Sequence, residues 1–128
     1  MKIKYNYNVW SDQWSIDTSK LIWRSWPGVA ALDNKIYVTG GQGEDGLLSR
    51  VDCYDPDTDT WTRVEDMNNA RRGHDLVNLH CRLYAIGGFD GVDSVEVYDP
   101  DTNTWTLLQH KLEGEVRTGG AGLVYMVI

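Results

Sequence analysis

The sequence of 128 residues contains no long hydrophobic run. Its longest uninterrupted apolar stretch, Leu123 to Ile128, is six residues, whereas a membrane-spanning helix needs about 20. The amino terminus, MKIKYNYNVW, has two lysines but no apolar segment after them, which argues against a signal peptide. We therefore expect a soluble, cytoplasmic protein that does not bind membranes.

Cysteine and histidine are few and scattered. The two cysteines, Cys53 and Cys81, lack the spacing of a zinc site or a disulfide framework, and we expect both to be small apolar residues in strands. The histidines His74, His80 and His110 have no metal-ligand spacing. The sequence therefore predicts no catalytic residue, no metal site and no cofactor, and we do not expect an enzyme.

Positive charge is also scarce, with 12 Lys and Arg against 19 Asp and Glu and a formal net charge of −7. A chain without a basic stripe does not attract nucleic acid or anionic membranes, so we exclude both as partners. The composition is otherwise that of one ordinary globular domain or less, with 41% hydrophobic and 24% charged residues.

One stretch of sequence occurs twice. The segment YDPDTDTWT, Tyr54 to Thr62, returns as YDPDTNTWT at Tyr98 to Thr106. In each copy a β-favouring pair ends on Tyr, Asp-Pro-Asp-Thr supplies turn residues, and Trp-Thr opens a new strand. The segment is a predicted β-hairpin, and its recurrence indicates a repeat architecture.

Three further markers keep the same period. A Tyr and Trp seven residues apart also occur upstream, at Tyr7 and Trp14. Paired glycines close the apolar runs IYVT and LYAI 47 residues apart, and an arginine opens each unit. These markers are Gly40-Gly41, Gly87-Gly88, Arg24, Arg71 and Arg117. Their common phase defines one repeated unit of 44 to 47 residues.

This order of an arginine, a strand, a strand ending in Gly-Gly, a strand ending in Tyr-Asp and a strand opened by Trp resembles the kelch repeat. The period agrees with the roughly 50 residues and four strands of one kelch blade in a β-propeller. The wording of YDPDTDTW and RLYAIGGFDG is most similar to the kelch-like (KLHL) family. The resemblance implies an all-β fold, a partial kelch propeller of about two and a half to three four-stranded blades.

The repeat predicts how the chain is divided. Residues 1–20 are expected to end one blade, 21–66 and 67–112 to form two full blades, and 113–128 to give the first strand of a further or closing blade. By resemblance, the carboxyl end looks natural and the amino end truncated. The predicted strands are Ile3–Tyr7, Gln13–Ile16, Val29–Leu32, Lys35–Thr39, Ser49–Tyr54, Thr60–Val64, Asp75–Leu79, Leu83–Ile86, Ser94–Tyr98, Thr104–Leu108 and Leu123–Ile128.

Eight repeated residues are predicted to be structural. Four are aromatic side chains that would fill the gap between neighbouring blades, and four are glycines expected at positive φ or where two backbones approach closely. They are Tyr54, Trp61, Tyr98, Trp105, Gly40, Gly41, Gly87 and Gly88.

The arginines Arg24, Arg71 and Arg117 each precede a first strand, so blade repetition would place them around one rim of the central channel. A guanidinium group binds carboxylates through a planar fork of donors. The resemblance implies that, in some blades of kelch-like proteins, the corresponding arginine contacts acidic peptide segments of partners. The alternative is that each arginine pairs with an Asp or Glu of a neighbouring loop, and both remain open.

The glycine-rich loops Gly41–Ser49 and Gly88–Ser94 would flank the same rim, where recognition is usually placed. Their acidic residues, Glu44, Asp45, Asp90 and Asp93, imply a ligand of mixed polarity. The predicted partner-binding residues are Arg24, Arg71, Arg72, His74, Arg117, Ser49, Phe89, Asp90 and Ser94.

The resemblance implies a protein-interaction module, the substrate-recognition kelch domain of a kelch-like adaptor of a cullin-RING ubiquitin ligase. The BTB and BACK domains that would contact the cullin are absent from this sequence. An actin-binding or cytoskeletal kelch protein is the alternative. Because its outer blades would present faces and edges meant for neighbours, the fragment is also expected to self-associate.

Overall fold

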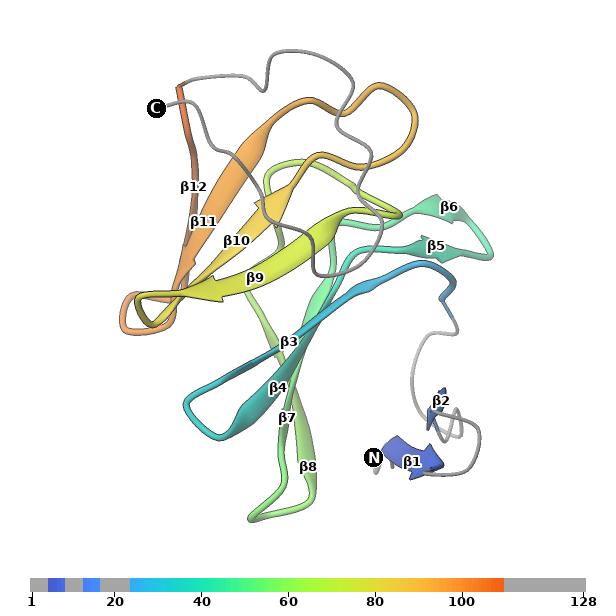
Figure 1. The fold of residues 1–128 in the computed structure, drawn as a ribbon, viewed down its shortest axis with the longest axis vertical. Helices are drawn as coiled ribbons and strands as arrows, with labels where there is room; N and C mark the ends of the chain where they lie inside the picture. Colours follow the sequence, from blue (N-terminus) through green and yellow to red (C-terminus); the bar gives the residue numbers. More distant parts are fainter. Residues whose placement is uncertain (1–4, 9–12, 17–23, 110–128) are drawn as a thin grey trace.

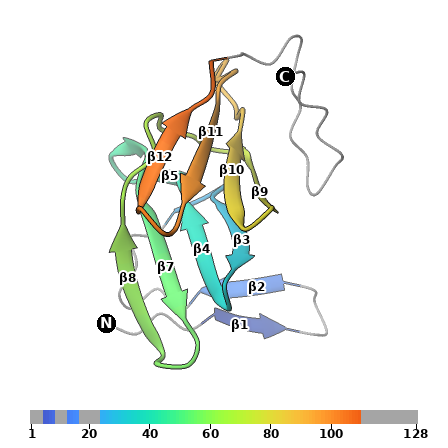
Figure 2. The ribbon, with the colours of Figure 1, turned by 90° about the vertical axis from the view of Figure 1, so that its left-hand side faces the viewer.

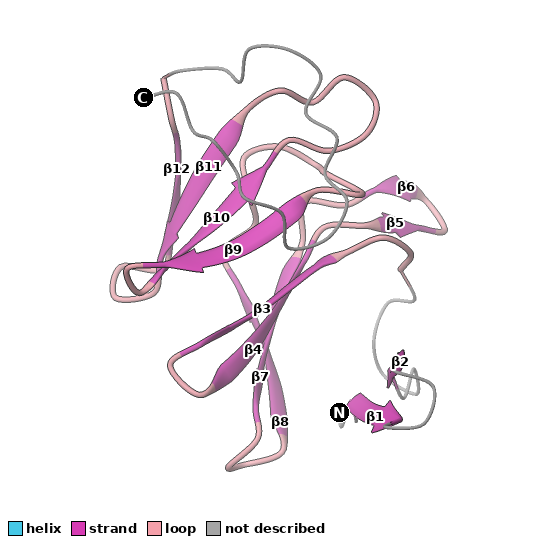
Figure 3. Ribbon diagram, in the orientation of Figure 1, coloured by secondary structure: helices cyan, strands magenta, loops and turns pink. Residues whose placement is uncertain are grey.

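The computed structural model describes residues 5–8, 13–16 and 24–109, in which all regular structure is β-strand. Figure 3 shows this at a glance, with strands and loops only among these residues. No described segment therefore forms a helix that could cross a membrane. The predicted all-β class is confirmed.

Two four-stranded antiparallel sheets dominate the fold (Figure 1). The first has the order β3–β4–β7–β8, and the second has the order β9–β10–β11–β12. In both, strands that follow one another along the chain are also neighbours in the sheet, which is the arrangement of a propeller blade. The strands are β3 (Gly28–Leu32), β4 (Lys35–Thr39), β7 (Val51–Asp55), β8 (Thr60–Val64), β9 (Asp75–Leu79), β10 (Arg82–Ile86), β11 (Val95–Asp99) and β12 (Thr104–Leu107).

Two short hairpins complete the described structure. The strands β1 (Tyr5–Asn8) and β2 (Gln13–Ile16) pair with each other near the amino terminus. In the connection from β4 to β7, β5 (Gln42–Gly43) pairs with β6 (Gly46–Leu47). The sequence predicted a loop without strands here, because its glycines disfavour strand formation.

Both hairpins at the start of a blade turn through two residues at positive φ. These residues are Asp33 and Asn34 in the first sheet, at 51° and 59°, and His80 and Cys81 in the second, at 51° and 60°. Positive φ at both central residues matches the right-handed twist of the strands. Cys81 is exposed in this turn, so its predicted position in a strand is wrong, whereas Cys53 is buried in β7.

The Asp-Pro-Asp hairpins are built alike in the two sheets. Tyr54 pairs with Trp61 across the first hairpin and Tyr98 with Trp105 across the second. The ring centroids are 5.1 Å and 5.0 Å apart, with the same interplanar angle of 36°. The repeated sequence motif therefore corresponds to a repeated geometry of the hairpin.

The core lies between the two sheets, which Figure 2 shows from the side. The rings of Tyr37 and Tyr98, one from each sheet, are 5.6 Å apart. Trp105 is buried here, and its Nε1 donates a hydrogen bond of 2.9 Å to the carbonyl oxygen of Glu65. Tyr98 and Trp105 thus join the second blade to the first.

The third strands begin later than predicted, at Val51 and Val95. The carbonyl oxygens just before them, of Arg50 and Ser94, accept bonds from the amides of Gly40 and Gly87. Smaller differences are that β1, β7 and β11 end one residue later than predicted, that β3 and β10 begin one residue earlier, and that β12 ends one residue earlier. Residues 3 and 4 of the first predicted strand lie outside the described residues. The predicted strand Leu123–Ile128, together with His110 and Arg117, lies outside the described residues.

Candidate functional site: an arginine and aromatic rim

The rim is the end of the two sheets where β4 leads to β7 and β10 leads to β11. Figure 1 shows these two connections on the same side, away from the Asp-Pro-Asp turns. Gly40 and Gly87 end the second strands here, with φ of 59° and 62°. A side chain at Gly40 would collide with the carbonyl oxygen of Arg71. The rim is therefore a place of close backbone approach between the blades.

Arg71 is completely buried beneath the rim. Its Nη1 donates to the carbonyl oxygens of Gly87 at 2.9 Å and Ser94 at 2.7 Å. Its Nη2 donates to Ser94 Oγ at 2.7 Å and to Glu96 Oε2 at 3.0 Å, and Nε reaches the same carboxylate at 3.2 Å. The guanidinium therefore ties the end of the second strand to the start of the third.

Arg24 makes the equivalent contacts in the first blade. Its Nη1 donates to the carbonyl oxygens of Gly40 at 3.1 Å and Arg50 at 3.2 Å. Its Nη2 pairs with the buried carboxylate of Asp52, which also accepts from Arg50. Both arginines pair with carboxylates, as in the alternative left open by the sequence, but these carboxylates belong to strands β7 and β11 and not to neighbouring loops. The partner-binding role of Arg24 and Arg71 stays a prediction.

His74 is also buried, with 6% of its surface exposed. Its Nε2 lies 2.7 Å from Thr39 Oγ1 of the other sheet. Burial, together with the nearby charge of Arg71, lowers the pKa of His74 to about 4. The imidazole is therefore neutral at pH 7 and connects the two blades from below the surface of the rim.

Three exposed residues and two half-buried ones form a group at the rim that we call the rim cluster: Trp26, Phe89 and Asp90 are exposed, and Gln42 and Arg72 are half-buried. The indole of Trp26 is 56% exposed and the ring of Phe89 43% exposed. Their centroids are 5.5 Å apart with the planes at 83°, an edge-to-face contact. The two rings come from different blades and form an apolar corner at the blade junction.

Arg72 lies in the same cluster. Its Nε donates to Asp90 Oδ2 at 2.8 Å and its Nη2 to Asp90 Oδ1 at 3.0 Å, while Nη1 donates to Gln42 Oε1 at 2.9 Å. Its guanidinium carbon stands 5.5 Å from the centroid of the Trp26 ring, within cation–π distance. The hydrogen bond to Asp90 raises the pKa of Arg72, and the same bond lowers the pKa of Asp90.

Trp26 was not among the predicted partner-binding residues. Its φ is 53°, in the left-handed region, and the position 47 residues later in the repeat is Gly73, with φ of 61°. A bulky residue at positive φ is a rare and strained conformation. The signal in the sequence was a tryptophan at a position where the next repeat has glycine.

The remaining predicted residues lie at the rim with other contacts. Ser94 Oγ accepts hydrogen bonds from Arg71 Nη2 and, at 2.8 Å, from Asn69 Nδ2. The carbonyl oxygen of Ser49 accepts a hydrogen bond of 2.9 Å from the amide of Met67. Both serines are half-buried. Their partner-binding role, like that of Arg117, stays a prediction.

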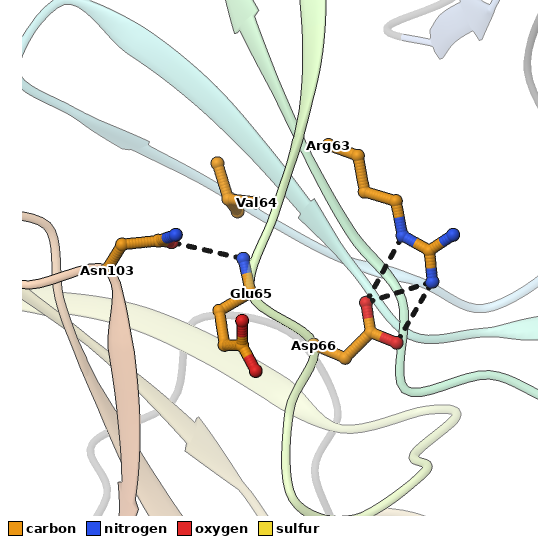
Figure 4. A pocket seen from close by; sticks show the side chains of 5 residues that line it. All are labelled: Arg63, Val64, Glu65, Asp66 and Asn103. Atoms are coloured by element: carbon orange, nitrogen blue, oxygen red, sulfur yellow. Dashed lines mark hydrogen bonds and ion pairs between the residues drawn. The ribbon is translucent and has the colours of Figure 1, made fainter.

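An open pocket outside the rim cluster is lined by Arg63, Val64, Glu65, Asp66 and Asn103. Figure 4 shows Arg63 facing Asp66, with 3.0 Å between Nη2 and Oδ2, and Asn103 Oδ1 accepting from the amide of Glu65 at 3.0 Å. These polar groups bind one another. In the described part of the chain, no three His, Cys, Asp or Glu side chains gather to hold a metal.

Comparison with known proteins agrees with the geometry. A family model described as the KLHDC2/KLHL20/DRC7 Kelch-repeats domain matches residues 2–128. Kelch-like protein 28 of Homo sapiens is 43% identical over 72 residues, which are 50% of this chain and 13% of the relative. An influenza virus NS1A-binding protein homolog of Xenopus laevis is 39% identical over 68 residues, 53% of this chain and 11% of the relative.

A third similar protein, an F-box/kelch-repeat protein of Arabidopsis thaliana, is 34% identical over 85 residues. The match covers 66% of this chain and 23% of that protein. The chain thus spans less than a quarter of the length of these relatives.

Proposed function

Since the chain belongs to the kelch-repeat family, in which interaction with other proteins is the typical role, we propose that its rim cluster is the surface that captures a partner protein. The family match and the similarity to kelch-like proteins support an interaction module of the propeller type. One relative is named for binding a viral protein, in keeping with such a role.

The observation that carries the proposal is the exposed corner of Trp26 and Phe89 beside Arg72. Tryptophan and arginine are enriched among the residues that dominate binding energy at protein interfaces, and phenylalanine is enriched in interfaces generally. The strained backbone of Trp26 supports the same assignment, since strained positions cluster at functional sites. The buried arginine below keeps the cluster on a rigid base.

For the whole protein, we propose the substrate-recognition role of a cytoplasmic kelch-like adaptor of a cullin-RING ubiquitin ligase. The support is the similarity to Kelch-like protein 28 and the repeat wording shared with that family. Contact with the cullin would belong to segments other than the kelch repeats. An actin-binding role is the second candidate, and co-sedimentation of the chain with filamentous actin separates the two.

The test is quantitative affinity capture with the immobilised 128-residue chain and two variants. Trp26→Ala combined with Phe89→Ala removes the apolar corner, and we expect a loss of at least tenfold in the recovery of specific partners. Leu107→Ala combined with Leu108→Ala is the matched control, because it also removes two exposed hydrophobic side chains, at 43% and 38% exposure, outside the rim cluster. Equal recovery by both variants would overturn the proposal.

A further inference from the structure

Two of the arginines predicted to bind an acidic ligand, Arg24 and Arg71, do not lie at the surface of the rim. Arg71 is 0% exposed and pairs with Glu96, and Arg24 is buried against Asp52. A ligand carboxylate would have to break these pairs and leave a buried charge without its partner, which is costly. Neither guanidinium is therefore offered to a partner.

Arg72 is nearer the surface, but each of its three nitrogens already donates a hydrogen bond. The two carboxylate oxygens of Asp90 accept hydrogen bonds from Nε and Nη2 of Arg72, and Oε1 of Gln42 accepts one from Nη1. This bidentate pair satisfies the fork of the guanidinium that would bind a ligand carboxylate. An acidic segment would thus compete with Asp90 for the same donors.

Exposed carboxylates stand at the same rim. Glu44 and Asp45 are exposed in the turn between β5 and β6, two and three residues beyond Gln42 of the rim cluster. Figure 1 shows this hairpin projecting from the rim end of the first sheet. The accessible charge beside the apolar corner is therefore negative.

From this charge distribution and the apolar corner, we infer that the rim binds an extended basic segment of a partner. An aliphatic or proline side chain of the segment occupies the corner of Trp26 and Phe89, and Lys or Arg residues beside it face Glu44 and Asp45. This inference rests on the proposed function and deepens it by naming the partner's chemistry. It differs from the acidic peptide implied by the family resemblance.

The apolar half of the segment follows from the geometry of the two rings. The two rings are in edge-to-face contact, at 83° with centroids 5.5 Å apart, and both are exposed, so they present adjoining apolar surfaces to one side chain. Extended proline-rich segments bind aromatic-lined grooves because their conformation is already ordered before binding. The basic half follows from charge complementarity, which selects partners and speeds their encounter.

A random library of dodecapeptides displayed on phage tests the inference with the 128-residue chain. We expect selected peptides to carry a net positive charge around a central proline or aliphatic residue. Glu44→Lys combined with Asp45→Lys should weaken a selected basic peptide by about tenfold, the order expected for two exposed ion pairs. Selection on this variant should shift toward neutral or acidic peptides.

The matched control is Asp57→Lys combined with Asp101→Lys, which makes the same charge change on exposed residues of the Asp-Pro-Asp turns. Its affinity for the basic peptide should stay within twofold of the parent chain at 150 mM salt. Selection of acidic peptides, absence of any enrichment, or equal effects of the two charge reversals would each overturn the inference.

Failure of the inference is distinguishable from failure of the proposed function. If acidic peptides are selected and Trp26→Ala with Phe89→Ala abolishes their binding, the rim is the partner site and only the partner's charge is wrong. If peptides bind equally well to the chain without the two rings, the proposed rim function is wrong, and the basic-segment inference fails with it.

Discussion

Arg71 and Glu96 form an ion pair in which neither side chain reaches solvent, with Nη2 and Oε2 3.0 Å apart. The carboxylate also accepts the amides of Asn68 at 2.6 Å and Asn69 at 3.1 Å, from the connection that follows the first sheet. One buried pair thus joins the connection between the two sheets to strand β11. Its members support the rim from below its surface.

Replacing Glu96 with Gln should lower the free energy of unfolding by about 3–5 kcal/mol, because the guanidinium of Arg71 stays buried without its countercharge. Urea denaturation measures the loss. Asp66→Asn is the control, since it breaks an ion pair whose side chains are 56% and 38% exposed and should cost no more than about 1 kcal/mol. Equal losses would show that the Arg71 pair is not held as the structure has it.

Trp105→Ala should destabilise the chain by about 3–5 kcal/mol, since it empties a buried site between the blades. It also leaves the carbonyl oxygen of Glu65 without its indole donor. Leu107 lies on the same strand and is 43% exposed, so Leu107→Ala should change the free energy of unfolding by less than about 1 kcal/mol. A melting temperature unchanged in Trp105→Ala would contradict the packing role.

Trp26→Gly should be more stable than Trp26→Ala by about 1 kcal/mol, the reverse of the usual order. Both variants lose the indole, but only glycine adopts a φ of 53° without steric cost. Chemical denaturation of the two variants side by side measures the strain directly. Alanine equal to or better than glycine would show that the backbone at residue 26 relaxes once the indole is removed.

His74 should make stability depend on pH. Its pKa is lowered from 6.5 to about 4 in the folded chain, so the unfolded state binds a proton first as pH falls, and the folded state loses stability between about pH 6.5 and 4. The loss should approach about 2 kcal/mol at pH 5. Because acidic residues titrate in the same range, the measurement is the difference in unfolding free energy between the parent chain and His74→Gln. A constant difference from pH 7.5 to 5 would contradict the assignment.

The sequence predicted the blades because their markers are local. Turn residues at Asp33-Asn34 and Pro56, and alternating strands between them, report on the backbone within a few residues. The same local signals placed β4 and β9 with the bounds that the structure has. The β5–β6 hairpin was missed because two-residue strands rich in glycine leave no such pattern.

The site was less predictable, because burial depends on contacts distant in the sequence. Arg71 and Arg72 are adjacent in the chain, yet one is buried and the other half-buried at the rim. The difference in burial depends on Glu96 of β11, which lies 25 residues after Arg71 and pairs with it. No local sequence pattern predicts that contact. Trp26 shows the same limit, since its exposed position depends on Phe89 of the next blade.

Arg71 also connects the two blades, although it lies in neither sheet. Its amide donates to the carbonyl oxygen of Leu48 at 3.1 Å and its carbonyl oxygen accepts from the amide of Gly41 at 2.7 Å, both in the connection from β4 to β7. Its side chain donates to Gly87 and Glu96 of the second blade. The boundary between the two repeats therefore cannot be drawn on either side of Arg71 without dividing its contacts. A gene breakpoint just before Arg71 would give a daughter protein whose first blade carries its own cation. A breakpoint just after Arg71 would leave the carboxylate of Glu96 buried in that blade without its cation. A repeat unit that keeps this ion pair therefore begins at or before the arginine and not at the first strand.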